Sequence, residues 1–460
     1  MVAAAVVVVV LIAATLLIVW WKRDSDSSGV RATWQPAPQT LLAPSMRVQP
    51  VPGWRTTVND LGLPIPAAGA ADQTRIATNV DPYWSSPFVG NLGDRGYFLA
   101  STSGTPNPQW WLVGLDVRDG RRLFAPVPLN STITYPPECF LNGPTAVLCL
   151  RNDADAATAW VIDAAAGTVS FTGPTDLRAY PGKLGVEQVG IYAVAGSMHK
   201  GVYGVGFRAE TTWFVPGDGT VHPKYLANTD FPSPTLATQP DTNPISFKET
   251  VFSLSDGKVI APELEENAQE QRTNVYPGGF AADIAISRTH SEIRFFDDTG
   301  KRISRRGIDG DLADTDIALP IVISKDHWTV FAPDGGKLLE EPGQPSREAL
   351  IIGNRLLMRD YSDSIAVRWQ QFDLHTGEKG KTCDHNMGIG YLGTDGTTVV
   401  FADGNANVGL VTRARDLTTC DTLWTLTSPV GSFRHVWRVN TTLVQLSDDG
   451  AELMSLLAPS

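Results

Sequence analysis

A short pattern of apolar and polar positions recurs along most of this chain. In Trp110 to Pro126, WWLVGLDVRDGRRLFAP, an apolar segment ends at Asp116, and the pair Asp119-Gly120 precedes a second apolar segment. Glycine after aspartate supplies the positive φ that a short hairpin turn needs. The pattern therefore predicts a strand, a tight turn and a second strand.

Units of this kind recur about forty residues apart, a period typical of propellers with four short strands per blade. Eight units can be distinguished. Their turns lie at Gly120, Gly167, Gly219, Gly257, Gly300, Gly336, Gly377 and Thr419-Cys420. A last unit, HVWRVN, TTLVQLS and AELMSLLAP, has three strands and lacks a fourth. The lone segment Arg47 to Val58 would complete it and close the ring, which hides two sheet edges.

We therefore predict an all-β fold, a single β-propeller of seven or eight four-stranded blades over residues 47–460, closed by an N-terminal strand. Eight blades are preferred. The middle, 225–345, is irregular, so short units there could merge. The alternative is two separate β domains, divided around 225–245, where the segment FPSPTLATQPDTNP is rich in proline.

The N-terminal segment is apolar throughout. Val2 to Trp21 is an uninterrupted apolar run, followed by Lys22-Arg23. About twenty helical residues span the hydrocarbon core of a bilayer. We predict a single-pass transmembrane helix over residues 1–23, and a flexible Ser/Asp- then Pro/Ala-rich tether over 24–46. A cleaved signal peptide is disfavoured because the apolar run is long and lacks a basic start.

Cysteine placement bears on the compartment. Cys139 and Cys149 flank the short reversal CFLNGPTAVLC, and Cys383 and Cys420 stand in matching places in neighbouring repeats. Two disulfides and an oxidising, extracytoplasmic location follow from this pairing, and four buried free thiols are the alternative. Lys22-Arg23 after the helix favours the opposite orientation, since positive residues flank the cytoplasmic side. We expect a plasma-membrane protein with its propeller outside.

The repeat also carries a family resemblance. WLVGLDVRDGRRLFAP and WQQFDLHTGEK resemble the repeat of pyrroloquinoline-quinone-type (quinoprotein-like) β-propellers. That family includes quinone-dependent dehydrogenases and cofactor-free envelope scaffolds. The arrangement also resembles the membrane-anchored propellers of actinobacterial envelopes, whose function the resemblance leaves open. The quinoprotein resemblance implies adjacent cysteines and a Ca²⁺ site for an enzyme, and no two cysteines here are adjacent.

No catalytic or cofactor-binding set stands out, and we predict neither an enzyme nor a cofactor or metal. The repeated aspartates Asp116, Asp163, Asp297 and Asp373 are interpreted as turn residues that accept backbone hydrogen bonds. Two acidic loops lack the spacing of a Ca²⁺ loop; they contain Asp153, Asp155, Asp309 and Asp311. His385 beside Cys383 could form a nucleophilic pair only if Cys383 were not in a disulfide.

The remaining indications concern partners. A net charge of −12 argues against nucleic acid. Most tryptophans fall on predicted strands, whereas Trp54 and Trp84 are candidates for an exposed interaction site. The polar loop 225–247 and the acidic stretch Glu263 to Glu270 are candidates for binding. We expect a protein-interaction scaffold or accessory subunit of the cell envelope; the alternatives are a module binding a sugar or lipid headgroup, and a quinoprotein-type oxidoreductase.

Overall fold

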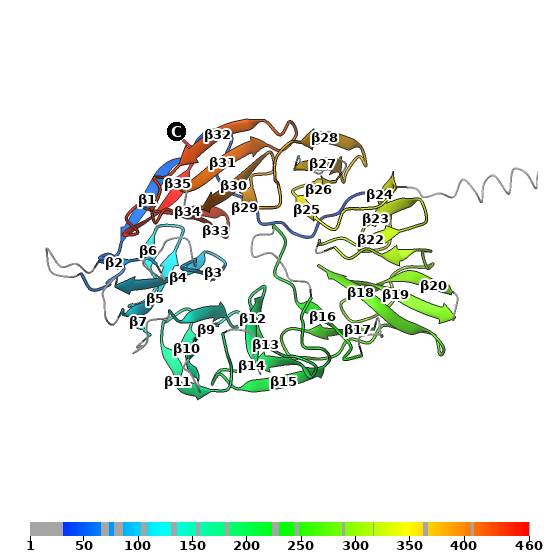
Figure 1. Cartoon of the computed structure of the whole chain (residues 1–460), viewed down its shortest axis with the longest axis horizontal. Helices are drawn as coiled ribbons and strands as arrows, with labels where there is room; N and C mark the ends of the chain where they lie inside the picture. The colour runs from blue at the N-terminus through cyan, green and yellow to red at the C-terminus, as the bar shows by residue number, and fades with distance from the viewer. Residues whose placement is uncertain are drawn as a thin grey trace, which may run out of the picture.

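A computed structural model of the chain describes the residues that carry the repeats. They are 31–65, 73–77, 86–102, 108–129, 136–152, 157–179, 184–222, 230–243, 248–287, 290–315, 317–361, 367–405 and 409–459. Within these ranges the chain forms nine hydrogen-bonded sheets. The sheets succeed one another in chain order around a central opening, with the first and last side by side (Figure 1). The fold is an all-β propeller, as predicted.

The first three sheets come from residues 74–216. The first contains β2 (Thr74–Arg75), β3 (Phe88–Leu92), β4 (Arg95–Thr102), β5 (Trp110–Asp116), β6 (Arg121–Arg122) and β7 (Val127–Pro128). The second contains β8 (Glu138–Leu141), β9 (Ala146–Asn152), β10 (Ala157–Asp163) and β11 (Val169–Thr175). The third contains β12 (Gly185–Val189), β13 (Tyr192–Ser197), β14 (Gly201–Val205) and β15 (Thr211–Pro216).

The next three sheets form the part of the ring that is irregular in sequence. The fourth contains β16 (Leu236–Pro240) and β17 (Glu249–Ser253). The fifth contains β18 (Gln269–Tyr276), β19 (Gly279–Ser287) and β20 (His290–Asp297). The sixth contains β21 (Asp311–Leu312), β22 (Ile321–Ile323), β23 (His327–Phe331) and β24 (Lys337–Pro342).

The last three sheets complete the ring. The seventh contains β25 (Ala349–Ile352), β26 (Arg355–Asp360), β27 (Arg368–Asp373) and β28 (Lys379–Cys383). The eighth contains β29 (Tyr391–Thr394), β30 (Thr398–Asn405), β31 (Gly409–Asp416) and β32 (Thr422–Thr427). The ninth contains β33 (Val436–Val439), β34 (Thr442–Leu446), β35 (Glu452–Leu457) and the early strand β1 (Val51–Thr57).

Each repeat of the sequence corresponds to one sheet, and the composite of the two chain ends is the ninth. One predicted turn is misplaced: Gly219 follows β15, the last strand of the third sheet, and leads to the bridge of His222 with Thr238 in the fourth. Eight of the sheets have three or more strands, and the fourth is the hairpin β16–β17. Single bridges flank this hairpin on both sides, His222 to Thr238 and Phe252 to Val259. The short units in the middle therefore stay separate. The single ring shows that the alternative of two separate domains is wrong.

The N-terminal strand closes the ring as predicted. β1 pairs antiparallel with β35, with Val51 opposite Leu457 and Thr56 opposite Leu453. The backbone N–H of Trp54 also donates to Ser455 Oγ at 3.1 Å. The first and last sheets lie side by side, so the ring has no open edge at this junction.

The segment before β1 differs from the predicted free tether. Residues 31–46, here called the N-terminal strap, lie across the sixth to ninth sheets, and Figure 1 shows them in blue beside the inner ends of the seventh and eighth. Leu42 N donates to Thr394 O at 2.8 Å, and Ala43 N donates to Thr441 O at 2.9 Å. Trp34, Leu42 and Met46 are buried. These apolar residues anchor a segment that its proline and alanine content alone assigns to a tether.

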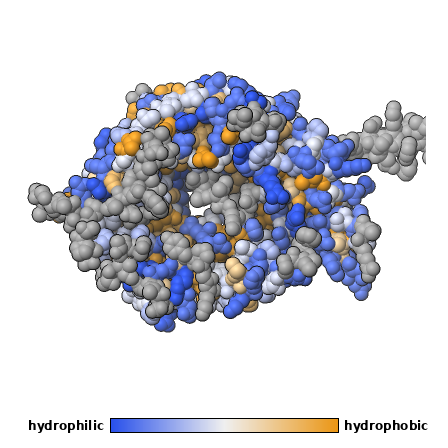
Figure 2. Space-filling view, in the orientation of Figure 1, coloured by the Kyte–Doolittle hydropathy of each residue, from blue (hydrophilic) through white to orange (hydrophobic). Residues whose placement is uncertain are grey.

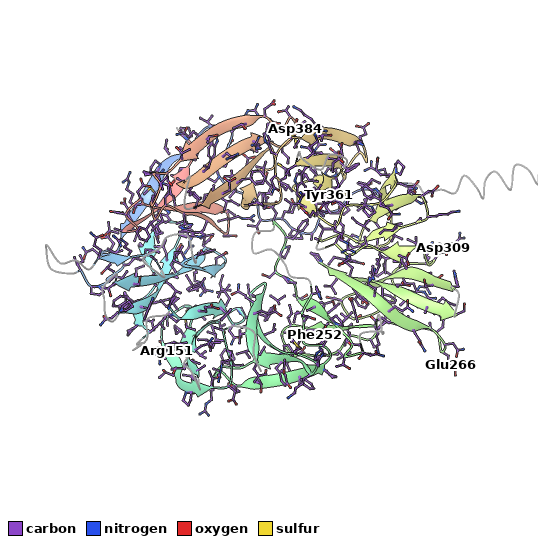
Figure 3. All side chains as sticks on the ribbon, viewed as in Figure 1. Arg151, Phe252, Glu266, Asp309, Tyr361 and Asp384 are labelled. Atoms are coloured by element: carbon purple, nitrogen blue, oxygen red, sulfur yellow. A yellow bond between two sulfur atoms is a disulfide. The ribbon has the colours of Figure 1, made fainter. Side chains whose placement is uncertain are left out.

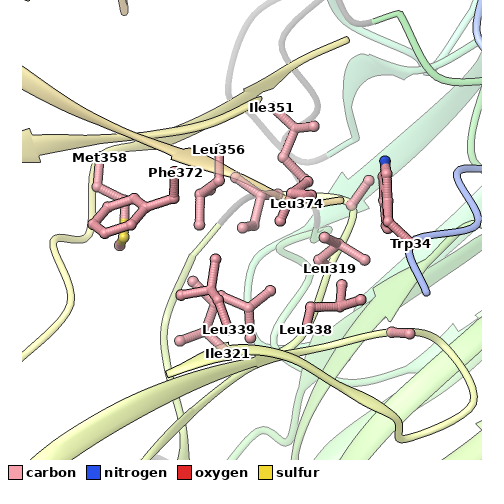
Figure 4. Close-up of a cluster of buried hydrophobic side chains, with 14 of the residues drawn as sticks. Trp34, Leu319, Ile321, Leu338, Leu339, Ile351, Leu356, Met358, Phe372 and Leu374 are labelled. Carbon is pink, nitrogen blue, oxygen red and sulfur yellow. The ribbon is translucent and has the colours of Figure 1, made fainter. Parts of the chain in front are cut away.

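The core consists of apolar clusters between neighbouring sheets. In the cluster between the sixth and seventh sheets, Trp34 of the strap packs at one end, beside Leu338 and Leu319 (Figure 4).

No helix of membrane-spanning length and hydropathy occurs among the described residues. The predicted helix, Val2 to Trp21, lies outside them.

Candidate functional site: a cleft between the fourth, fifth and sixth sheets

The repeated aspartates are turn residues, as the sequence predicts. Asp163 Oδ1 accepts hydrogen bonds from the backbone N–H groups of Ala165 and Ala166, at 2.9 and 2.7 Å. Asp116, Asp297 and Asp373 accept equivalent bonds within their own turns. Each carboxylate thus closes a turn. Within the described ranges, no three His, Cys, Asp or Glu side chains converge as metal ligands would.

Both predicted disulfides are present. Cys139 and Cys149 face each other across β8 and β9, and Cys383 and Cys420 join the seventh sheet to the eighth. Cys420 takes the place of the turn glycine and has a φ of 63°. Because Cys383 is disulfide-bonded, a Cys–His nucleophile with His385 is excluded.

Trp54 packs between sheets. Its indole Nε1 donates to Val117 O at 2.7 Å, and its ring covers the turn glycine Gly120. A Cβ at Gly120 would lie 2.6 Å from Trp54 Cε3, so this close approach requires glycine. Trp213 covers Gly257 in the same manner. Trp54 is therefore a packing residue between the ninth and first sheets, and the predicted site at Trp84 lies outside the described residues.

Part of the polar loop that is a candidate for binding makes an internal contact. Residues 230–235, the crossing segment, lead from β16 across the ring (Figure 1). Asp230 is fully buried, and its carboxylate bonds Arg438 Nη1 of β33 and Tyr391 Oη of β29, both at 2.6 Å. Its backbone carbonyl accepts from Thr40 N of the strap at 2.7 Å. Burial raises the pKa of Asp230, and the Arg438 guanidinium opposes that rise.

A cleft of about 270 Å³ lies where the fourth, fifth and sixth sheets meet. Its lining residues come from all three sheets: His222, Thr238, Glu249, Arg272, Thr273, Asn274, Val275, Leu312, Ala313, Asp314 and Thr315. A wider cleft of about 720 Å³ continues from it and shares Arg272, Asp314 and Thr315. β18 is the strand of the fifth sheet nearest the central opening (Figure 1), so this cleft adjoins the channel wall. In the surface view, the ring is hollowed at its centre (Figure 2).

Thr273 holds together two carboxyl groups, of which Glu249 lines this cleft and Glu270 lies beside it. The backbone N–H of Thr273 donates to Glu249 Oε2 at 2.9 Å, and its hydroxyl donates to Glu270 Oε1 at 3.2 Å. Burial raises the pKa of each glutamate to about 7, and the negative charge of Glu249 adds to the rise at Glu270. Both groups can therefore exchange protons near neutral pH, which is uncommon for glutamate.

Arg272 is the main positive group of the cleft. Its Nη1 donates to Leu312 O at 3.1 Å, which ties β18 to β21. Its charge opposes the pKa rise at Glu249 and at Asp283. The sequence pointed to this region through the acidic stretch that ends at Glu270. The other cleft residues are spread from 222 to 315, and only the fold brings them together.

A closed ring of nine sheets with an acidic cleft beside its channel defines a β-propeller with a candidate binding site in its wall. The chain belongs to the family of the conjugation-associated 9-bladed beta-propeller domain, whose model matches residues 26–459. An uncharacterized protein of Mycolicibacterium smegmatis (strain MKD8) is 41% identical over 450 residues, covering 95% of this chain and 91% of that protein.

Two solved structures are similar at a lower level. BamB from Moraxella catarrhalis has a TM-score of 0.40 and 10% identity, covering 89% of this chain and 100% of that one. The computationally designed Ika8 protein has a TM-score of 0.33 and 11% identity, covering 69% of this chain and 98% of that one. Neither likeness bears on function.

Proposed function

We propose that this protein is a non-enzymatic scaffold of the cell envelope that binds other proteins of a conjugation apparatus. The description of its family supports the link to conjugation. The observation that carries the scaffold role is the exposure of aromatic side chains on the third sheet. Phe214 on the outer strand β15 is 48% exposed, and Phe207 in the preceding turn is 62% exposed. Exposed aromatic residues on a rigid surface are typical of protein-binding sites.

A double variant tests this role. Phe207→Ser with Phe214→Ser should abolish the recovery of cross-linked partner proteins from conjugating cells and lower the conjugation frequency, since both aromatic contacts are lost. Met198→Ser is the matched control, because Met198 is 76% exposed on the same sheet but in the β13–β14 turn. Equal recovery of partners with the double variant and the wild type would refute this site.

We further propose that the predicted helix Val2–Trp21 anchors the propeller to the plasma membrane, with the ring on the outer side. The two disulfides support an oxidising compartment. Arg31 is already fixed on the ring, since its Nε donates to Leu338 O at 2.6 Å and its Nη2 donates to Leu374 O at 2.8 Å. Only residues 22–30 would then link the helix to the sixth sheet, a reach of about 30 Å when extended.

Protease protection tests the orientation. In spheroplasts, an external protease should remove the propeller of the full chain, whereas a cytoplasmic marker protein stays intact. If the propeller is cut only after the membrane is lysed, the ring lies inside the cell. A pool that remains in the soluble fraction would instead contradict the anchor.

A further inference from the structure

We propose that the cleft between the fourth, fifth and sixth sheets binds the ammonium group of a lysine residue presented by a peptide or protein. This inference goes beyond the scaffold role and does not depend on the aromatic residues of the third sheet. It rests on three features of the cleft: the paired carboxyl groups, polar atoms without partners, and an excess of negative charge.

The carboxyl pair supplies the acceptors. Glu249 lines the cleft and Glu270 lies beside it, both bonded to Thr273. Thr273 donates to one oxygen of each carboxylate, and the second oxygen of each can accept from a ligand. An ammonium group has three donors in a compact arrangement and suits a site with several acceptors around one point.

Two further polar atoms lack partners among the described residues. Thr315 is 8% exposed, its Oγ1 has no hydrogen bond, and it lines both clefts. Asn274 Nδ2 is a buried donor without an acceptor, and Asn274 also lines the smaller cleft. A buried polar group left without a partner is costly, so a ligand that pairs with it gains affinity. The Thr315 hydroxyl would accept from the ammonium group, and Asn274 would donate to a backbone carbonyl of the same lysine residue.

The excess of carboxyl groups around the cleft favours a positively charged ligand. Titratable groups from all three sheets interact with or line the two connected clefts: Asp218, His222, Lys248, Glu249, Glu270, Arg272, Asp283, Asp311, Asp314, Lys325 and Arg347. Six of these are carboxyl groups, against two lysines, two arginines and one histidine, and the basic residues Lys325 and Arg347 line only the wider cleft. Among the described residues, no three His, Cys, Asp or Glu side chains converge as metal ligands would.

Binding should depend on pH. Burial raises the pKa of Glu249 and of Glu270 to about 7 in the empty cleft. An ammonium group binds best when the two carboxyl groups are ionised, so it competes with the protons that these groups carry at low pH. The lysine amine stays protonated throughout this range. Affinity should therefore rise from pH 6 to pH 8 by about tenfold for each of the two carboxyl groups that must ionise, and change little above pH 8.

The experiment uses the full chain in detergent and titration calorimetry with Nα-acetyl-lysine methylamide. The wild type should bind this probe saturably, whereas Nε-acetylation of the probe, which removes its charge, should abolish binding. Glu249→Gln should weaken binding about tenfold, because a charge-assisted hydrogen bond is lost. Thr315→Val should weaken it about fivefold. Glu266→Gln, the matched control on the outer margin of the ring (Figure 3), should bind as the wild type does.

Several results would overturn the proposal. These are the absence of saturable binding, equal binding of the Nε-acetylated probe, or unchanged binding in both cleft variants. Pentylamine, which has a single amine and no carbonyl, should bind more weakly; equal affinity would refute the assignment to a lysine residue. Near-ultraviolet circular dichroism shows whether Glu249→Gln is folded, and if it is not, Thr315→Val decides the question. If the cleft variants lose binding of the lysine probe but still capture partner proteins in cells, the lysine site and the scaffold role are independent of each other.

Discussion

The buried pair of Asp230 and Arg438 allows a sharp test of how the crossing segment is held. Asp230→Asn keeps the size of the side chain and removes its negative charge. The Arg438 side chain, 7% exposed, would then lie beside a neutral amide in place of a carboxylate. The perturbation is confined to the two contacts of the carboxylate, with Arg438 and Tyr391, since the Asp230 backbone carbonyl still accepts from Thr40 N.

The expected cost follows from burial. Removing one partner of a buried ion pair lowers the free energy of unfolding by about 3–5 kcal/mol, because it leaves a buried charge without compensation. The Arg438 side chain also donates to the carbonyls of Thr40 and Asn440, and these bonds satisfy its other nitrogens without neutralising it. Asp230→Asn combined with Arg438→Met should therefore be less destabilised than Asp230→Asn alone, because the uncompensated charge is gone.

Urea unfolding and hydrogen exchange measure the two consequences. We expect a lower urea midpoint for Asp230→Asn, and faster exchange of the Thr40 and Leu42 amides of the strap. Glu348→Gln is the control, since the ion pair of Glu348 with Arg359 is at the surface and should leave the midpoint unchanged. A wild-type midpoint for Asp230→Asn, or a double variant as unstable as the sum of its single changes, would refute the reasoning.

Three further predictions concern stability. The pKa of Glu249 is raised from 4.5 to about 7. Its contribution to the free energy of unfolding is therefore fully present below pH 4.5 and is lost as the pH rises through 7. Glu249→Gln should therefore stabilise the protein at pH 8 by about 3 kcal/mol and have little effect at pH 4, as thermal melts would show. Replacing Cys383 and Cys420 together by serine should cost about 4 kcal/mol from their separation of 37 residues, and an unchanged urea midpoint would contradict this. Trp54→Ala should cost about 2 kcal/mol, since a half-buried ring and its bond to Val117 are lost, without altering partner capture; loss of a partner at unchanged stability would restore an interaction role.

The sequence predicted the features that depend on local patterns. Strands that end in an aspartate and turns that require a positive φ leave a mark every forty residues or so, and each of these marks lies at a turn between paired segments of one sheet except Gly219, which follows the last strand of the third. The closing strand was predictable because a last unit with three strands needs a fourth. The disulfides were predictable because Cys139 and Cys149 flank one short reversal, whereas Cys383 and Cys420 stand at matched places in neighbouring repeats.

The strap and the cleft were not predictable in this way. Residues 31–46 have the composition of a tether, and their anchors Trp34, Leu42 and Met46 are too widely spaced to show a period. The loop around Asp230 was a candidate for binding because it is long and polar, yet the Asp230 carboxylate is directed inward to Arg438. Contacts between residues some two hundred positions apart depend on how the ring closes, which no local pattern shows.

Ring closure has a consequence for synthesis of the chain. Met46 O accepts from Trp424 Nε1, 378 positions later, and Trp54 N bonds Ser455, 401 positions later. At about 5–20 residues per second, a ribosome needs roughly 20–80 s to make the intervening chain. During that interval, the earliest segment waits with its backbone groups and apolar anchors unpaired. A nascent chain of this protein therefore offers a chaperone its longest-lived binding site at the beginning of the polypeptide.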